Sequence, residues 1–188
     1  MSWLVLGLGL FFAIHLLPIL APAGREQLRL RLGAQGYRGS FALLAAIGLG
    51  LMIYGKSQAP FINLWLPPLW GRHLTMLLML LALISLVTMW LPSNLRRLSP
   101  HPLLWSVTLW GLAHLSSNGD LASVLLFGSF VLYAQVARLS QNRRGAQASV
   151  RRCGLWRELV VLGVACLAYG ALLWGHGYFA GIPLIALS

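Results

Sequence analysis

Two histidines lie within long apolar runs of this 188-residue sequence, and their side chains are the best suited to chemistry. His15 follows Phe11 and Phe12 in the first run, and His114 lies in "WGLAHLSSNGD", which begins at Trp110. A buried imidazole needs a partner, because an unsatisfied polar group in apolar surroundings costs free energy. A backbone carbonyl is one such partner, and the iron of a haem is the other.

Helical spacing places further residues on the face of His114. Trp110, Gly111 and Asn118 lie three to four positions away from it and share its face on a helix. Gly111 is expected to let a flat macrocycle approach, and Asn118 to form a hydrogen bond in the same slot. Phe11 is expected to form the facing apolar wall in the first run. Two interpretations of these residues stay open at this point. In one, a haem lies in a slot with His15 and His114 as its metal ligands, or with a single histidine as its ligand; in the other, each histidine donates to a backbone carbonyl of its own surroundings.

The remaining three histidines are expected to have structural roles. His73 and His176 lie at ends of apolar runs, where we expect solvated, interfacial side chains. His101 stands between two prolines at the start of a run and is expected to help begin a helix.

Acidic side chains are too few for a proton relay or a cation site. Glu26, Asp120 and Glu158 are the only three, and each lies near an expected helix end. Asp120 follows a Ser-Asn-Gly turn and is expected to cap the next helix. The sequence also contains neither an HExxH zinc pattern nor a glycine-rich phosphate loop.

The composition is that of an integral membrane protein. The chain is 59% hydrophobic and 9% charged, with a mean hydropathy of +0.78, whereas soluble domains have about a quarter charged residues. We therefore expect an all-α bundle of about six transmembrane helices in a single domain, 1–188. The first run is expected to be a span rather than a cleavable signal. The expected spans are 3–20, 37–54, 73–91, 102–116, 120–139 and 159–174.

Basic residues are distributed unequally between the two sides of these spans. The loops after the first, third and fifth spans carry twelve arginines, whereas the other side has only Lys56 and Arg72. Positively charged loops stay in the cytoplasm, so both termini are expected on the outer side of a bacterial inner membrane. The net charge of +11 is explained in this way, and no nucleic-acid partner is expected. Two roles stay open for Arg25, Arg29 and Arg38. They either act only as determinants of this topology, or they also pair with the propionates of a haem at the cytoplasmic surface.

Glycine occurs in two short strings, "GLGL" at 7–10 and again at 48–51. Glycine lets membrane helices approach closely, and we expect that role here.

Several stretches resemble the NnrU family of bacterial membrane proteins. The resemblance covers residues 101–130, "HPLLWSVTLWGLAHLSSNGDLASVLLFGSF", and the stretches "HLLPILAP" and "LGAQGYRGSFAL" within 15–44. The tail "HGYFAGIPL" from His176 fits the same pattern. The family is named for an association with nitrite and nitric oxide reduction, and it is related to the haem-dependent zeta-carotene isomerase of plants.

The resemblance implies a haem b with His114 and His15 as its ligands. A cysteine implicated in a ligand switch of the isomerase falls on Gly111, and a further functional histidine of the isomerase falls near Lys56. These departures weigh against isomerase chemistry in this chain.

Three functions stay open at this point. The first is a haem protein that supports nitrogen-oxide metabolism through electron transfer or assembly of a membrane reductase. The second is a haem-dependent isomerase that acts on a hydrophobic small molecule such as a polyene. The third is a cofactor-free structural or partner-binding protein of the lipid bilayer.

Overall fold

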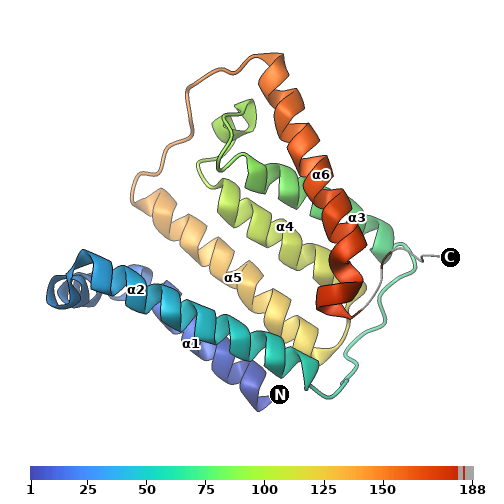
Figure 1. The fold of residues 1–188 in the computed structure, drawn as a ribbon, viewed down its shortest axis with the longest axis horizontal. Coiled ribbons are helices and arrows are strands. Elements are labelled where there is room, and N and C mark those ends of the chain that lie inside the picture. Colours follow the sequence, from blue (N-terminus) through green and yellow to red (C-terminus); the bar gives the residue numbers. More distant parts are fainter. Residues whose placement is uncertain (182–183, 185–188) are drawn as a thin grey trace.

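Six α-helices and one short 3₁₀ helix make up the chain in the computed structural model, which describes residues 1–181 and 184. The long helices form an open bundle, and extended pairing in the described residues is confined to one bridge between Asn63 and Asp120 (Figure 1). The helices are α1 (Ser2–Leu20), α2 (Pro22–Ser57), α3 (Gly71–Val87), η1 (Asn94–Arg97), α4 (Pro102–Ser117), α5 (Leu121–Arg143) and α6 (Leu155–Ala180). The expectation of an all-α membrane bundle is thereby confirmed.

Four of these helices are long and apolar enough to cross a bilayer. They are α1, α2, α5 and the part of α6 through Tyr178. The helices α3 and α4 have 17 and 16 residues, which corresponds to about 25 Å at 1.5 Å per residue. The prediction of six therefore holds for the number of α-helices in the described residues. Four of those helices meet this length for a complete span.

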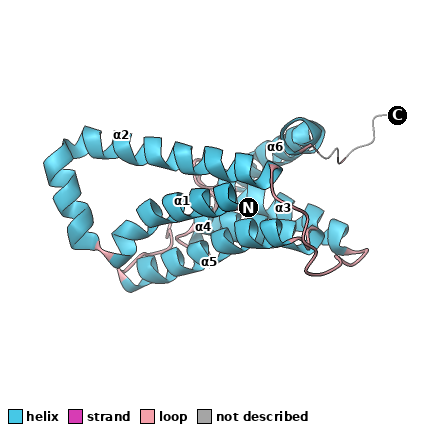
Figure 2. Ribbon diagram, turned by 90° about the horizontal axis from the view of Figure 1, so that it is seen from below, coloured by secondary structure: helices cyan, strands magenta, loops and turns pink. Residues whose placement is uncertain are grey.

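The segment between the first two spans is helical, whereas the sequence led us to expect a loop. The helix α2 begins at Pro22 and contains a break at Gly33, where φ is 71° and ψ is 165°. A proline in the first turn and helix-favouring Arg, Glu, Gln and Leu residues explain the early start. Figure 2 shows the result, a short first limb of α2 followed by a long limb beside α1.

The two "GLGL" strings meet where α1 packs against α2. A Cβ atom on Gly7 would lie 2.7 Å from the carbonyl oxygen of Gly48, and one on Gly55 would lie 2.1 Å from the backbone nitrogen of Leu4. The two backbones therefore touch along this hairpin. The expected role of glycine in close helix approach is confirmed.

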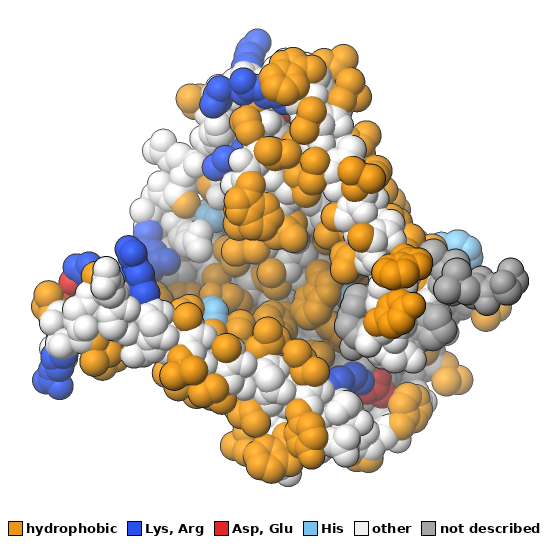
Figure 3. Space-filling model, viewed as in Figure 1, with side chains coloured by type: hydrophobic (Ala, Val, Ile, Leu, Met, Phe, Trp, Pro, Cys, Tyr) orange, Lys and Arg blue, Asp and Glu red, His pale blue; other side chains and the backbone are white. Residues whose placement is uncertain are grey.

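The two ends of the bundle differ in charge. The end that we call the arginine-rich end holds the α1–α2 junction, η1 and the 144–154 segment, and Figure 3 shows Lys and Arg side chains gathered there. The opposite end, named here the Asp120 end, carries the 58–70 loop. At the arginine-rich end Glu158 accepts hydrogen bonds from the Asn94 backbone and the Ser93 hydroxyl, each 2.7 Å long.

The turn after α4 anchors the 58–70 loop at the Asp120 end. The backbone N–H of Leu64 donates to the Gly119 carbonyl at 2.8 Å, and that of Leu121 donates to the Ile62 carbonyl at 2.8 Å. Gly119 is buried against this loop, and a Cβ atom there would lie 1.9 Å from the carbonyl oxygen of Trp65. Glycine is therefore required at this position for packing.

Asp120 has the predicted capping role and a second partner. Its carboxylate accepts from the Ser123 backbone N–H at 3.0 Å, which caps α5. It also accepts from the Lys56 ammonium at 2.8 Å, which ties α2 to α5. Burial raises the pKa of the Asp120 carboxyl, but the hydrogen bonds from Lys56 and Ser123 together hold it below its usual value.

We expect Gly119→Ala to destabilise the protein by about 1–3 kcal/mol, because the added methyl group must displace the Trp65 backbone. The measurement is the thermal unfolding midpoint in detergent. Gly128→Ala is the matched control, since a Cβ atom at Gly128 meets nothing within 4 Å. Equal midpoints for the two variants would show that the loop does not pack on Gly119.

Asp120→Asn is expected to lower the stability at pH 7, since the ion pair is lost while the cap is kept. A lowered pKa means that the charged carboxylate stabilises the fold above about pH 4. That contribution disappears as the pH falls through the lowered pKa. The unfolding midpoints of the variant and the wild type should therefore converge in acid. A difference that persists at pH 2 would contradict the assignment.

Candidate functional site

A large cavity lies inside the Asp120 end of the bundle. Its volume is about 1030 Å³, at the upper limit of ordinary cofactor and ligand sites. Figure 3 shows the bundle hollowed between α2 and α6. A smaller cavity of about 310 Å³ adjoins it between α3, α4 and α6.

Five helices line the larger cavity, each with one stripe of side chains. The stripes follow the i, i+3, i+4, i+7 spacing of a single helical face or part of it. They comprise Leu49, Met52, Ile53 and Lys56 of α2; Arg72, Thr75, Met76 and Met79 of α3; Trp110, His114 and Ser117 of α4; Ser123, Leu126, Phe127 and Phe130 of α5; and Tyr169, Leu172, Leu173 and His176 of α6. The lining is thus mostly apolar, with a few polar groups.

His114 lies on this lining with one ring nitrogen already engaged. Its Nδ1–H donates to the Trp110 carbonyl oxygen at 2.9 Å, and its ring stacks on Phe127 with 4.4 Å between centroids. A carbonyl can only accept, so the proton of a neutral ring is on Nδ1 and the lone pair is on Nε2. This is the arrangement in which histidine ligates a metal, with the second nitrogen held by a backbone carbonyl.

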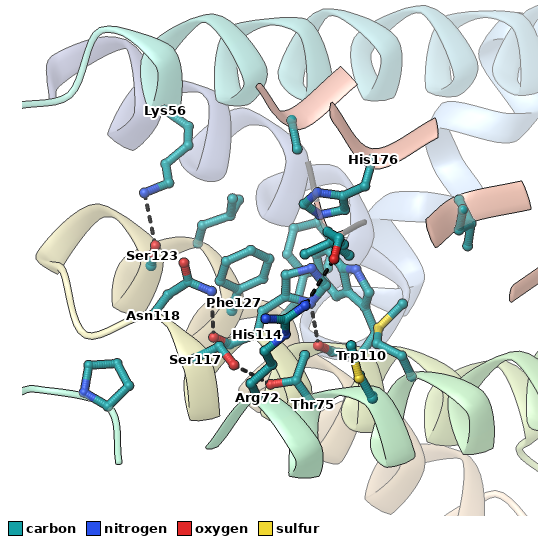
Figure 4. Close-up of a pocket in the computed structure, with 18 of the residues that line it drawn as sticks. Lys56, Arg72, Thr75, Trp110, His114, Ser117, Asn118, Ser123, Phe127 and His176 are labelled. Atoms are coloured by element: carbon teal, nitrogen blue, oxygen red, sulfur yellow. Dashed lines mark hydrogen bonds between the residues drawn. The ribbon is translucent and has the colours of Figure 1, made fainter. Parts of the chain in front are cut away.

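Trp110 and Asn118 also line the cavity, as the sequence predicts. The Asn118 amide donates to the backbone carbonyl of His114 at 2.7 Å (Figure 4). Gly111 instead faces α5, where a Cβ atom would lie 2.5 Å from the Val131 side chain. Its missing side chain therefore serves helix packing rather than approach to the cavity.

His15 does not line either cavity. Its ring stacks on Phe11 at a centroid distance of 3.9 Å and contacts Phe41 and Tyr133. Its Nδ1–H donates to the Phe11 carbonyl oxygen at 2.7 Å, which repeats the bond of His114.

Aromatic rings occupy the space between the two histidines. Phe11 contacts Phe130 at 5.3 Å, and Phe130 contacts Trp110 at 5.5 Å between centroids. The structure thus does not bring His15 and His114 into one cavity. Joint ligation of one haem stays a prediction that requires these rings to move.

The three arginines considered for haem propionates lie away from the cavity lining. Arg25 lies over the Tyr37 ring, and the guanidinium of Arg29 pairs with Glu26 at 2.8 Å. Arg38 is exposed on α2. The cations that do line the cavity are Lys56 and Arg72.

His176 lines the cavity, whereas the sequence predicts a solvated, interfacial side chain. The predicted sixth span ended at residue 174, whereas α6 continues to Ala180. His176 therefore lies inside a helix, and Figure 4 shows it among the cavity side chains with His114 and Arg72. The spacing of Tyr169, Leu172 and His176 at i, i+3 and i+7 is the signal that indicates this face.

Comparison with known proteins identifies one family. The sequence model described as NnrU protein matches residues 3–184, nearly the whole chain. No curated protein and no solved structure matches the chain. The matched range includes every cavity helix and the turn after α4, and the chain belongs to the NnrU family.

Proposed function

We propose that the protein binds a haem b in the large cavity, where His114 would hold the iron. The observation that carries this proposal is the His114 ring, which lines the cavity while its Nδ1 is held by the Trp110 carbonyl. Nε2 is then the basic nitrogen that a ferric or ferrous iron requires.

The donor set favours haem over a bare metal ion. The described residues contain no group of three or more His, Cys, Asp or Glu side chains that holds a metal. A structural or catalytic zinc takes three or four protein ligands. A macrocycle supplies four nitrogens itself, so one or two histidines suffice.

The remaining lining fits an amphiphilic cofactor. Leu126, Phe127 and Phe130 offer apolar contacts from α5, whereas Arg72 and Lys56 lie on the same lining as cations. A haem has an apolar ring with two propionates, and Arg72 and Lys56 can pair with these carboxylates. Lys56 pairs with the Asp120 carboxylate and also donates to Ser123, whereas Arg72 donates to the Leu184 carbonyl at 2.9 Å. Because a guanidinium has five N–H donors, Arg72 is the stronger candidate for a propionate.

Bound haem supplies a one-electron couple between ferric and ferrous iron. With the family resemblance, this chemistry favours a role in nitrite and nitric oxide metabolism, by electron transfer or in the assembly of a membrane reductase. The protein's own residues would hold the ring, and the Trp110 carbonyl orients the imidazole.

The membrane orientation is part of the same proposal. We place the arginine-rich end in the cytoplasm of a bacterium and the Asp120 end, with the cavity and both termini, on the outer side of the inner membrane. The supporting observation is the collection of Arg side chains at one end of the bundle (Figure 3).

Haem binding is tested by the visible spectrum of the protein purified from cells supplied with a haem precursor. We expect Soret and α/β bands in the wild type and a loss of at least tenfold in bound haem in His114→Ala. His73→Ala is the matched control, because His73 is exposed and outside the cavity lining. A wild type without these bands would overturn the proposal.

Orientation is tested by labelling single cysteines with a membrane-impermeant maleimide in intact cells. Cys153 and Cys166 are both free and are first replaced by Ser. We expect Gln58→Cys to be labelled, and Gln147→Cys to be labelled only after the cells are opened. Both glutamines are exposed, at opposite ends of the bundle. Reversed labelling would contradict the orientation.

A further inference from the structure

His176 reaches the cavity from α6, opposite the helix that carries His114. Tyr169, Leu172 and Leu173 accompany it on one face of α6. The helices α4 and α6 lie on either side of α3, which packs against both of them. The two imidazoles therefore approach the cavity from different walls.

The two histidines also lie at corresponding positions along their helices. His114 is three residues from the end of α4 at Ser117, and His176 is four residues from the end of α6 at Ala180. At 1.5 Å per residue, both are within about 6 Å of those ends. In Figure 1 both helices run from the arginine-rich end toward the Asp120 end.

His15 lies near the opposite end of the bundle. It is five residues from the end of α1 at Leu20, and that end belongs to the arginine-rich end. The depth difference between His15 and His114 follows from the direction of α1 and cannot be removed by a change of rotamer. His176, like His114, lies within four residues of the C-terminal end of a helix that runs toward the Asp120 end.

Both imidazoles border the larger and the smaller cavity. Met79, Trp110 and Leu172 are the other residues that line the two cavities together. A group bound where the cavities meet is thus bordered by both rings.

We infer that His176 would be the second histidine to hold the iron of the haem that His114 holds, an inference that rests on the proposed function. Both donors are then imidazoles, one from α4 and one from α6. A haem iron held by two histidines would have no open position for a substrate or a gas. The site is therefore one for electron transfer rather than for isomerisation of a polyene.

The experiment compares the haem-loaded wild type with His176→Ala and His15→Ala by electron paramagnetic resonance and by carbon monoxide binding to the reduced form. We expect low-spin ferric haem and no rapid carbon monoxide binding in the wild type and in His15→Ala. His176→Ala should retain haem through His114, become high-spin and bind carbon monoxide at least a hundredfold faster. Added imidazole should restore the low-spin signal.

The outcomes separate the inference from the proposed function. A low-spin His176→Ala protein, or a high-spin His15→Ala protein, overturns the role of His176 and leaves haem binding at His114 intact. A low-spin signal that is lost in Met79→Leu but kept in His176→Ala identifies methionine as the second ligand and also overturns it. If His176→Ala does not fold, His176→Gln is measured in its place. A wild type without haem overturns both proposals.

Discussion

The hydrogen bond from His114 Nδ1 to the Trp110 carbonyl is the interaction on which the site depends. In a bilayer, the backbone N–H and C=O groups of a helix are hydrogen-bonded to each other. A polar side chain must therefore find its hydrogen-bond partner on its own helix or on a neighbouring one. The bond uses an acceptor four residues earlier and fixes the proton on Nδ1. It thereby leaves the lone pair on Nε2 of a ring that lines a mostly apolar cavity.

Chain direction determines which histidines can act together. The helices α4 and α6 both run from the arginine-rich end toward the Asp120 end, so residues near their C-termini share a depth. The helix α1 runs the other way, and His15 near its C-terminus is placed at the far end. The same bond to a carbonyl four residues earlier forms at both His15 and His114. The hydrogen bonding of the two imidazoles within their own helices is thus alike, and the two sites differ in their place in the fold.

The sequence predicts well what depends on local patterns. Apolar length gives six helices, Asp120 caps α5, and Gly7 and Gly48 bring two helices together. It predicts poorly what depends on where helices end and which faces meet. The face of Gly111 was assigned from its spacing to His114, yet in the helix that position turns toward α5. His176 lies beyond the predicted end of the sixth span at residue 174, which indicates an interfacial side chain, whereas α6 continues to Ala180.

The run that follows His114 connects the cavity to the loop at the same end. Thr75 of α3 donates to the Ala113 carbonyl at 2.8 Å and contacts the hydroxyls of Ser116 and Ser117, which fixes the last turn of α4. Two residues later, Gly119 and Asp120 hold the 58–70 loop and Lys56. The polar stretch from Ser116 to Asp120 therefore has a structural role. The serine hydroxyls attach the end of α4 to α3, and Gly119 and Asp120 attach the turn after α4 to the 58–70 loop, α2 and α5. The position of the His114 ring is therefore determined by α2, α3 and α5 together.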